Sequence, residues 1–498
     1  MRKSKWIGTA LGLALCTALL PACSQTGSSS NQSSANAAAP ADVQVQWNRK
    51  LEKQVRDAIA NAPANGLKPD LFLKGGEKGP ALTQAALRYG EALAHGYADP
   101  TKIFPIYTIP RPSGDVRQGF MQAVQKGDLT DWFNSLPPQT DEYKALSQAH
   151  LHYLQLAAKT PNFQPVPDGD PIKPGSHDKR VAALAAALTA MGYYGHQPQP
   201  AHRNGGKAAP QSNAPAIIGY SPQLVAAVKR LQGDFGLKTD GIVGGNTLDA
   251  VNLGPAGLAR EAAIAMERLR WLQRDPPQTR IDVNTAATVL DYWRDGQHMD
   301  RREVVAGEPD KQTPQLQANM VNLVAYPTWT VPKSIAEKEL ASKGQSWLAA
   351  NNFSIKDGQY VQASGPKNSL GIVKFDLDDK YAIYLHDTPA KALFSLPDRH
   401  RSHGCVRVQN AVAFANAIAT EEGVADQFQK AMAGQQEQFV KLPKPIPVRL
   451  LYQTAFWDGS RVQFRPDVYG WDDNVAAALG LVRGVKWQPV QQSGDIGP

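Results

Sequence analysis

Apolar residues recur at helical spacing through the first third of the chain. Trp47, Leu51, Val55 and Ile59 follow one another every four residues, and similar patterns continue to about residue 172. Apolar positions with this period place one side of each helix against a core. We therefore expect a helical scaffold domain over residues 45–172.

A second helical region follows a break rich in proline and glycine, and we expect a domain over residues 175–255. The stretch 196–216 is too polar and too rich in proline and glycine to pack, which predicts a disordered insertion. After it, Ser221 and Pro222 have the residue types that cap and begin a helix, and Gly236 can end that helix.

The segment that follows Gly236 contains a series of turn and cap residues. Asp240-Gly241 predicts a tight turn, and Thr247 can cap the next short helix. The residues Gly236, Leu237, Asp240, Gly241, Gly244 and Thr247 form the pattern G-L-x-x-D-G-x-x-G-x-x-T. This pattern resembles the core of the peptidoglycan-binding domain, a small three-helix module. The resemblance implies binding of glycan strands, although such modules can also serve as spacers.

Strand patterns take over after one more helical stretch at about residue 262. Asp295-Gly296 lies between two apolar runs, which is a strong hairpin signal. A second Asp-Gly pair predicts another hairpin in the C-terminal stretch 456–498. We therefore expect a mostly antiparallel β domain over residues 262–455, followed by a hairpin and a tail. The chain as a whole is predicted to be an α+β protein of several domains.

A helical pattern at about residues 333–365 interrupts the strands, so we expect a helical insertion in the β domain. Trp329 and Trp347 flank the start of this insertion. They can line a substrate channel, but large aromatic side chains more often pack in a core.

Composition and charge narrow the classes of function. The chain has 498 residues, too many for one core, and its 42% hydrophobic and 20% charged residues are usual for a globular protein. Its net charge of +8 is spread along the chain without a Lys/Arg block. We therefore expect no nucleic acid partner, and diffuse positive charge suits a protein near an anionic polymer or membrane.

The N-terminus predicts export. Residues 1–22 combine a basic start, a short apolar run and small residues, which is the pattern of a signal peptide. The sequence LPAC, ending at Cys23, resembles the lipobox of bacterial lipoproteins, although Pro21 departs from the usual motif and ordinary cleavage nearby is the alternative. Residues 23–44 have the composition of a flexible tether. We expect a periplasmic protein, anchored through lipidated Cys23 to the outer membrane of a Gram-negative envelope.

Cysteine use singles out one thiol. Cys16 lies in the signal peptide and Cys23 would carry lipid, which leaves Cys405 alone in the body of the chain. No intramolecular disulfide can then form, and an unpaired thiol in an exported protein calls for an explanation. His150 and His152 have no third ligand nearby in the sequence, so we interpret them as surface residues rather than metal ligands.

Cys405 has the surroundings of a nucleophile. It lies in the sequence SHGCVR, polar on one side and cationic within two residues, a setting that we expect to lower its thiol pKa. His386, His400 and His403 could complete a zinc site with it, but structural zinc sites usually contain paired cysteines. We therefore favour a nucleophile over a zinc ligand, and we expect neither a metal nor a cofactor.

A thiol nucleophile needs a base, and two histidines compete for that role. His403 is two positions before Cys405, so on an extended strand the two side chains would share a face. His386 would have to be brought close by the fold. The residues alone leave both possibilities open.

The spacing from His386 to Cys405 resembles a known signature. His386 is followed by fifteen residues and then by Ser402, His403, Gly404 and Cys405, which resembles the motif H-x(14–17)-[ST]-H-G-C of the L,D-transpeptidase (YkuD-type) catalytic domain. The order of helical scaffold, peptidoglycan-binding module and catalytic domain with an insertion resembles the large Gram-negative branch of that family.

The resemblance implies a chemistry and a set of roles. Cys405 would attack the carbonyl of the third residue of a tetrapeptide stem and release D-alanine, and an amine of another stem would then form a 3→3 cross-link. His386 would be the general base or acid, oriented by the carbonyl of Asp387. His403, Gly404 and Ser402 would shape the oxyanion pocket. Arg407 would position stem carboxylates or brace the loop, and motif members often carry asparagine at its position.

Stem peptides and glycan strands are thus the expected partners, with other cell-wall enzymes as further candidates. A cysteine peptidase (L,D-carboxypeptidase) that trims stems uses the same acyl-enzyme and differs only in its acceptor, which is water. Transfer to a protein amine is another alternative. A peptidoglycan-binding lipoprotein with an inactive catalytic domain is disfavoured because the motif is intact.

Overall fold

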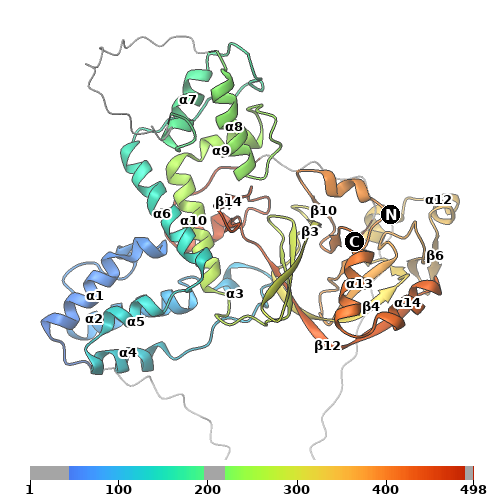
Figure 1. Ribbon diagram of the computed structural model, residues 1–498, viewed down its shortest axis with the longest axis horizontal. Coiled ribbons are helices and arrows are strands. Elements are labelled where there is room, and N and C mark those ends of the chain that lie inside the picture. The colour runs from blue at the N-terminus through green and yellow to red at the C-terminus, as the bar shows by residue number, and fades with distance from the viewer. Residues whose placement is uncertain (1–43, 196–218, 488–496, 498) are drawn as a thin grey trace, which may run out of the picture. The chain divides into compact units, whose positions relative to one another are not determined.

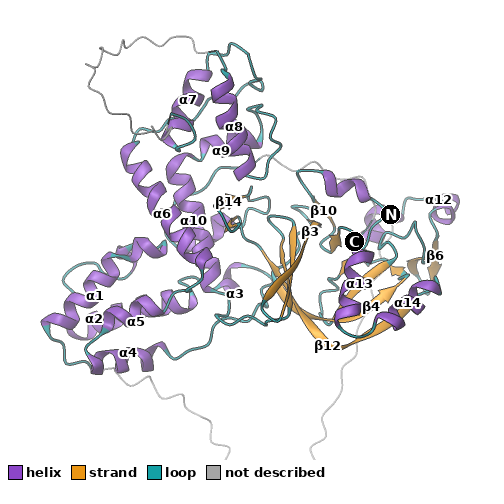
Figure 2. Cartoon of the chain, in the orientation of Figure 1, coloured by secondary structure: helices purple, strands orange, loops and turns teal. Residues whose placement is uncertain are grey.

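The computed structural model describes residues 44–195, 219–487 and 497 (Figure 1). The predicted signal peptide with Cys23, the tether and the insertion 196–216 therefore lie outside the described residues. Within those residues, no helix has the length and apolar character that crossing a membrane requires. The structure confirms an α+β chain with separate helical and strand-rich parts (Figure 2).

Helices build the first part of the chain, as the apolar spacing predicts. Leu51, Val55 and Ile59 are all buried on one side of the first helix, and the side chain of Asn48 caps it by accepting a hydrogen bond from the N–H of Leu51. The helices of this part are α1 (Arg49–Ala60), α2 (Gly79–His95), α3 (Pro100–Ile103), α4 (Val116–Lys126), α5 (Leu129–Ser135) and α6 (Asp141–Lys159), with 3₁₀ turns at Ala62–Asn65 and Pro69–Leu71.

Three helices follow: α7 (Val181–Ala190), α8 (Pro222–Asp234) and α9 (Asn246–Asn252). The predicted cap is confirmed, because the side chain of Ser221 accepts a hydrogen bond at the start of α8, and Gly236 follows the helix with a φ of 64°. The prediction for Thr247 is wrong. Gly245 occupies the N-cap position before α9, and Thr247 lies inside the helix, where its hydroxyl accepts a hydrogen bond from Gln232 at 3.2 Å.

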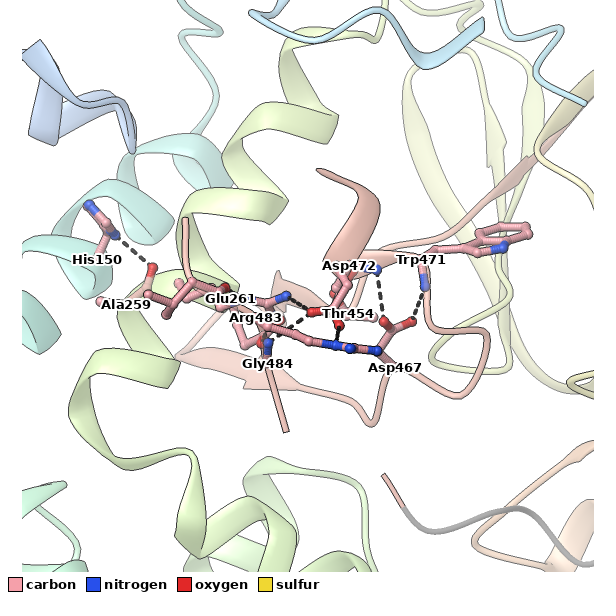
Figure 3. Close-up of polar contacts among 12 residues, drawn as sticks. His150, Ala259, Glu261, Thr454, Asp467, Trp471, Asp472, Arg483 and Gly484 are labelled. Atoms are coloured by element: carbon pink, nitrogen blue, oxygen red, sulfur yellow. Dashed lines mark hydrogen bonds and ion pairs between the residues drawn. The ribbon is translucent and has the colours of Figure 1, made fainter. Parts of the chain in front are cut away.

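The helix α10 (Gly254–Arg270) packs against α6 and carries charged residues into the interior. Arg270 donates to Glu267 at 3.1 Å and to the hydroxyl of Tyr143 at 2.7 Å, and all three residues are buried. The interpretation of His150 as a surface residue is also wrong: it is 6% exposed and its Nδ1 contacts the carbonyl of Ala259 at 2.7 Å (Figure 3). The spacing of apolar residues did not indicate that α10 packs against the side of α6 that carries His150.

A buried network joins α10 to the end of the chain. Arg268 is ion-paired with Asp472, the first residue of α15 (Asp472–Ala478), and Arg260 with Asp473 at 2.5 Å. Asp467 accepts hydrogen bonds from the backbone N–H groups of Trp471 at 3.0 Å and Asp472 at 2.8 Å (Figure 3). Burial, together with the charge of Asp472, raises the pKa of Asp467 to about 7.

The strand-rich part is a nine-stranded sheet in the order β10-β3-β11-β9-β8-β4-β12-β1-β2. Because β3 also pairs with β2, the sheet closes on itself. Its strands are β1 (Arg280–Asn284), β2 (Val289–Arg294), β3 (Gln297–Gly307), β4 (Leu316–Ala325), β8 (Val373–Leu377), β9 (Leu385–His386), β10 (His400–Ser402), β11 (Val406–Val408) and β12 (Gln438–Leu451). Most pairings are antiparallel, but β1 with β12, β3 with β10 and β9 with β11 are parallel.

The turn and the core of this sheet follow from the sequence. The predicted hairpin at Asp295-Gly296 joins β2 to β3, and both residues have positive φ angles, as such a tight turn requires. One face of the strands contributes residues such as Ile281 and Val283 to the main core. The helices α13 (Ala411–Glu421) and α14 (Ala425–Ala433) complete that core, with Phe414 fully buried.

The insertion is only partly helical, which corrects the prediction. It contains α11 (Lys333–Ile335), a π-helical turn (Ala336–Leu340) and α12 (Gln345–Ala350), but also a small sheet of β5 (Trp329–Thr330), β6 (Phe353–Lys356) and β7 (Gln359–Gln362). Trp329 is 1% exposed, and Trp347 stacks on Phe353 with ring centroids 6.0 Å apart. Both tryptophans therefore pack in the insertion's own core.

The second predicted hairpin is also present. β13 (Ala455–Trp457) pairs with β14 (Val462–Phe464) around Asp458-Gly459. Phe464 stacks on Phe235 with centroids 5.3 Å apart, so the hairpin packs against the end of α8. The C-terminal segment thereby contacts parts of the chain that lie far away in sequence.

We expect the network around α10 to be essential for stability. Asp472→Ala leaves the buried guanidinium of Arg268 without its partner and should lower the free energy of unfolding by about 3–5 kcal/mol. Chemical denaturation measures the effect. The control is Arg483→Ala, which removes an exposed partner of Asp473 in the same network and should change the stability far less. Equal losses in the two variants would contradict this account.

Candidate active site

The fold brings His386 next to the loop that carries Cys405. Cys405 lies between β10 and β11, and β11 runs parallel to β9 with Arg407 paired to His386. His386 is fully buried and Cys405 is 5% exposed. Two segments nineteen residues apart in sequence (405 − 386) are thus neighbours in one sheet.

The loop before Cys405 is held by its own side chains. The hydroxyl of Ser402 accepts a hydrogen bond from the N–H of Gly404 at 3.2 Å and donates one to the carbonyl of Cys405 at 2.6 Å. Gly404 has a φ of 116°, a conformation that suits glycine. Ser402 and Gly404 therefore act on the shape of the loop, which sets the direction of the Cys405 side chain and backbone N–H.

A second layer, which the sequence analysis missed, supports this loop. The hydroxyl of Thr313 donates to the carbonyl of Gly404 at 2.9 Å, and the hydroxyl of Tyr469 donates to the carbonyl of Gly307 at 2.8 Å. Thr313 in turn donates its backbone N–H to Tyr469 at 3.3 Å. No motif marks these residues, because they come from segments far from the thiol.

The ring of His386 has a defined tautomer. Its Nδ1 lies 2.5 Å from the carbonyl oxygen of Asp387, the contact that the family resemblance implies. Since a carbonyl only accepts, Nδ1 carries the proton and Nε2 presents a lone pair. Nε2 is buried and has no hydrogen-bond partner among the described residues. Burial, assisted by the charge of Arg407, lowers the pKa of His386 to about 3, so the imidazole is neutral.

Asp387 is itself fixed. Its carboxylate is ion-paired with Lys391 and accepts a hydrogen bond from the N–H of Ile372 at 3.2 Å. At Gly371, which has a φ of 62°, a β-carbon would collide with this carboxylate. The glycine allows Asp387 to approach, and Asp387 holds the carbonyl that orients His386.

The thiol itself corrects a prediction. Burial raises the pKa of Cys405 to about 12, although a hydrogen bond with Tyr384 acts in the opposite direction. The cationic neighbours in the sequence do not produce a thiolate, because burial dominates. Tyr384 was missed, but its position two residues before His386 on an extended segment could have indicated it.

His403 has a different environment from His386. Its Nε2 lies 2.5 Å from Nζ of Lys311 and also contacts the carboxylate of Glu339, which belongs to the π-helical turn of the insertion. The ring is therefore held between two charged groups. Nδ1 of His403 has no hydrogen-bond partner within the described ranges. His403 links the thiol loop to the insertion, whereas His386 lies in the sheet.

The remaining predicted residues, Arg407 and His400, are both buried. Arg407 is 1% exposed in β11, and a β-carbon at Gly497 would lie 2.9 Å from its Nη2. His400 contacts the carbonyl of Thr285 at 2.9 Å and the carboxylate of Asp398 at 3.1 Å. In the part of the chain that the structure describes, no three His, Cys, Asp or Glu side chains are grouped to hold a metal ion.

Family models match three parts of the chain. Residues 278–427 match the L,D-transpeptidase catalytic domain (YkuD), residues 40–149 match the scaffold domain, and residues 218–251 match the "Putative peptidoglycan binding domain". The first match contains His386 and Cys405, and the third contains the turn residues between α8 and α9. The sequence resemblances to both domains are confirmed.

A curated relative covers part of the chain. A Haemophilus influenzae protein described as "Putative L,D-transpeptidase" is 28% identical over 247 residues, which is 45% of this chain and 50% of that protein. The match thus spans half the length of the relative.

Solved structures that are similar to the chain include L,D-transpeptidases. One from Mycobacterium smegmatis is 14% identical over 34% of this chain and 58% of its own, with a TM-score of 0.21. One from Xylanimonas cellulosilytica is 16% identical over 57% of this chain and 98% of its own, with a TM-score of 0.19. At these TM-scores the likeness carries no structural argument, and the family assignment rests on the sequence matches.

The buried thiol leads to a prediction about pH. Alkylation requires the thiolate, so iodoacetamide should modify Cys405 slowly at pH 7 and progressively faster up to and beyond pH 10, because its pKa is raised to about 12. Intact-protein mass spectrometry measures the rate at each pH, with free cysteine as the reference. A rate that reaches a plateau below pH 8 would show a preformed thiolate and contradict the prediction.

Proposed function

Because the chain carries the catalytic domain of the L,D-transpeptidase family, we propose that it forms 3→3 cross-links between peptidoglycan stems through an acyl-enzyme on Cys405. The observation that carries the proposal is the fixed tautomer of His386, whose Nδ1 donates to the Asp387 carbonyl and whose Nε2 is unpartnered among the described residues. A neutral imidazole with a free lone pair, in the strand next to the thiol loop, has the form that a general base needs.

The first half of the reaction acylates the thiol. Both groups are neutral at rest, so Nε2 of His386 takes the proton while sulfur bonds to the carbonyl carbon of the third stem residue. The backbone N–H of Cys405 stabilises the oxyanion, with Ser402, Gly404 and His403 shaping the pocket around it. His386 then gives its proton to the nitrogen of D-alanine as the amide bond breaks.

The second half transfers the acyl group. An amine on a second stem attacks the thioester carbon, His386 removes a proton from that amine, and the thiol is regenerated when the carbon–sulfur bond breaks and sulfur takes the proton back. Water in place of the amine would make the enzyme a carboxypeptidase, and a protein lysine would make it a protein-attaching transferase. Arg407, buried in β11 beside His386, positions a stem carboxylate or braces the loop.

The products distinguish these acceptors. Incubation of the protein with disaccharide-tetrapeptides should yield a cross-linked dimer of one tetrapeptide and one tripeptide unit, with one D-alanine released per cross-link. Mass spectrometry of the products measures the yield, and Cys405→Ala is the control without a nucleophile. Tripeptides alone would show a carboxypeptidase, and unchanged substrate would contradict the proposed function.

The two histidines should differ in their effect on acylation. His386→Ala removes the base and should reduce acylation of Cys405 by a carbapenem at least about 100-fold, the usual lower bound for a general base. His403→Ala should leave measurable acylation, because His403 contacts Lys311 and Glu339. The mass shift of the intact protein over time gives both rates. The reverse order of the two variants would assign the base to His403.

We also propose that the protein is periplasmic and anchored by lipid on Cys23, as the sequence pattern of residues 1–23 indicates. Cys23→Ala should move the protein from the membrane fraction to the soluble periplasmic fraction. Fractionation of Gram-negative cells followed by immunoblotting measures the distribution. Retention of the variant in the outer membrane would contradict the anchor, and a soluble wild-type protein would indicate ordinary cleavage.

A further inference from the structure

A large cavity of the described chain lies apart from the thiol. It has a volume of about 1160 Å³ and is open to solvent. Its walls come from the helical scaffold, from β1, β2, β3 and β12, and from β13 with the turn that follows it. Neither Cys405 nor His386 lines it. The volume exceeds the roughly 300–1,000 Å³ of a usual small-molecule pocket, which suits a ligand larger than a metabolite.

The floor of this cavity is the polar face of the closed sheet. Side chains alternate along a strand, so the face opposite Ile281 and Val283 carries Arg280, Asp282 and Asn284. These three residues line the cavity. The sheet therefore has a core on one face and a polar floor on the other.

The charges of the floor neutralise one another. Asp282 accepts hydrogen bonds from Arg280 at 2.8 Å and from Nε of Arg449 at 2.6 Å, and both arginines are less than 10% exposed. Asp291 accepts from His298 at 2.7 Å. Because the ionic groups already have partners, the floor offers oriented polar atoms without a strong preference for a charged ligand. A neutral, hydroxyl-rich molecule suits such a surface.

Aromatic rings and an unpartnered amide complete the walls. Trp132 from the scaffold, Trp293 from β2 and Trp457 from β13 line the cavity and are only half-buried. Gln453 also lines it. Although this side chain is 7% exposed, its Oε1 has no hydrogen-bond partner in the described ranges. A buried acceptor without a partner is costly unless a ligand or water satisfies it.

Glu142 of the scaffold faces this floor. Burial raises its pKa to about 7, with further contributions from the nearby charges of Asp282 and Asp291. A carboxyl group that is partly protonated near neutral pH can both donate and accept hydrogen bonds. Paired carboxylates, amides and amphipathic indole rings together form a surface for sugar rings, which present hydroxyls at their edges and C–H groups on their faces.

We propose that this cavity binds the glycan strand of peptidoglycan and holds it while its stems react at Cys405. This proposal rests on the proposed function, because it assigns a binding site to the glycan whose stem peptides would react at Cys405. β3 connects the two places: Arg301 lines the cavity, and Val305 pairs with Arg407 beside the thiol loop. Four residues of strand span about 14 Å, so a glycan in the cavity places its stems within reach of the thiol.

The test measures binding of peptide-free glycan strands to the full chain carrying Cys405→Ala, by isothermal titration calorimetry. Trp293→Ala and Trp457→Ala should each weaken binding by about tenfold or more, the size expected for truncating a central aromatic contact. Trp293→Phe keeps a ring and should retain most of the affinity. Trp47→Ala is the matched control, because Trp47 is a half-buried scaffold tryptophan outside the cavity that hydrogen bonds to Thr83.

Three outcomes would overturn the proposal: no binding of glycan to the Cys405→Ala protein, unchanged affinity in both cavity variants, or displacement of the glycan by free tetrapeptide. The second would assign glycan binding to another part of the chain, such as the peptidoglycan-binding module. Gln453→Ala provides a smaller change if a tryptophan variant does not fold, and it should also weaken binding. Carbapenem acylation of the wild-type protein tests Cys405 without any glycan, so failure of the cavity and failure of the proposed function are distinguishable.

Discussion

The buried charges of α10 are the constraint on which the rest of the structure depends. A helix that carries arginine and glutamate side chains into the interior is stable only if each charge has a partner. Arg270 finds Glu267 and Tyr143, Arg268 finds Asp472, and Arg260 finds Asp473. These partners belong to α6 and α15 as well as to α10 itself, so helices distant in sequence are packed around one axis. Apolar contacts alone would permit the helices to slide along one another, whereas an ion pair fixes their register.

Burial also determines the state of the thiol and the imidazole. The buried side chains of α10 keep their charges, whereas these two groups are kept neutral. Both groups lose water, and each is held in its neutral form: the pKa of Cys405 is raised and that of His386 is lowered. A resting ion pair of thiolate and imidazolium is therefore disfavoured. A neutral thiol is protected against electrophiles and oxidants. In the proposed reaction, the proton of the thiol moves only when a substrate carbonyl is present to receive the sulfur.

Local patterns predicted the elements well, and long-range packing accounts for most of what they missed. Hairpins at Asp295-Gly296 and Asp458-Gly459, and the cap at Ser221, depend on two to four neighbouring residues, so the chain specifies them locally. The burial of His150 depends on α10, more than one hundred residues later (259 − 150 = 109). The high pKa of Cys405 depends on the packing around the loop, whereas its sequence neighbours suggested a low one. Thr313 and Tyr469 belong to no sequence motif, because they are far in sequence from the thiol loop and support it only in the folded structure.

The support of the thiol loop by Tyr469 has a consequence for the order of events in a cell. A chain is synthesised from its N-terminus, so Cys405 and His386 leave the ribosome before the segment that holds Tyr469. Until that segment has followed and packed, the contacts through Gly307 and Thr313 to Gly404 are incomplete. The arrangement delays completion of the thiol loop until the chain has been synthesised past Tyr469. A chain that is still being synthesised therefore carries Cys405 on a loop whose support is incomplete.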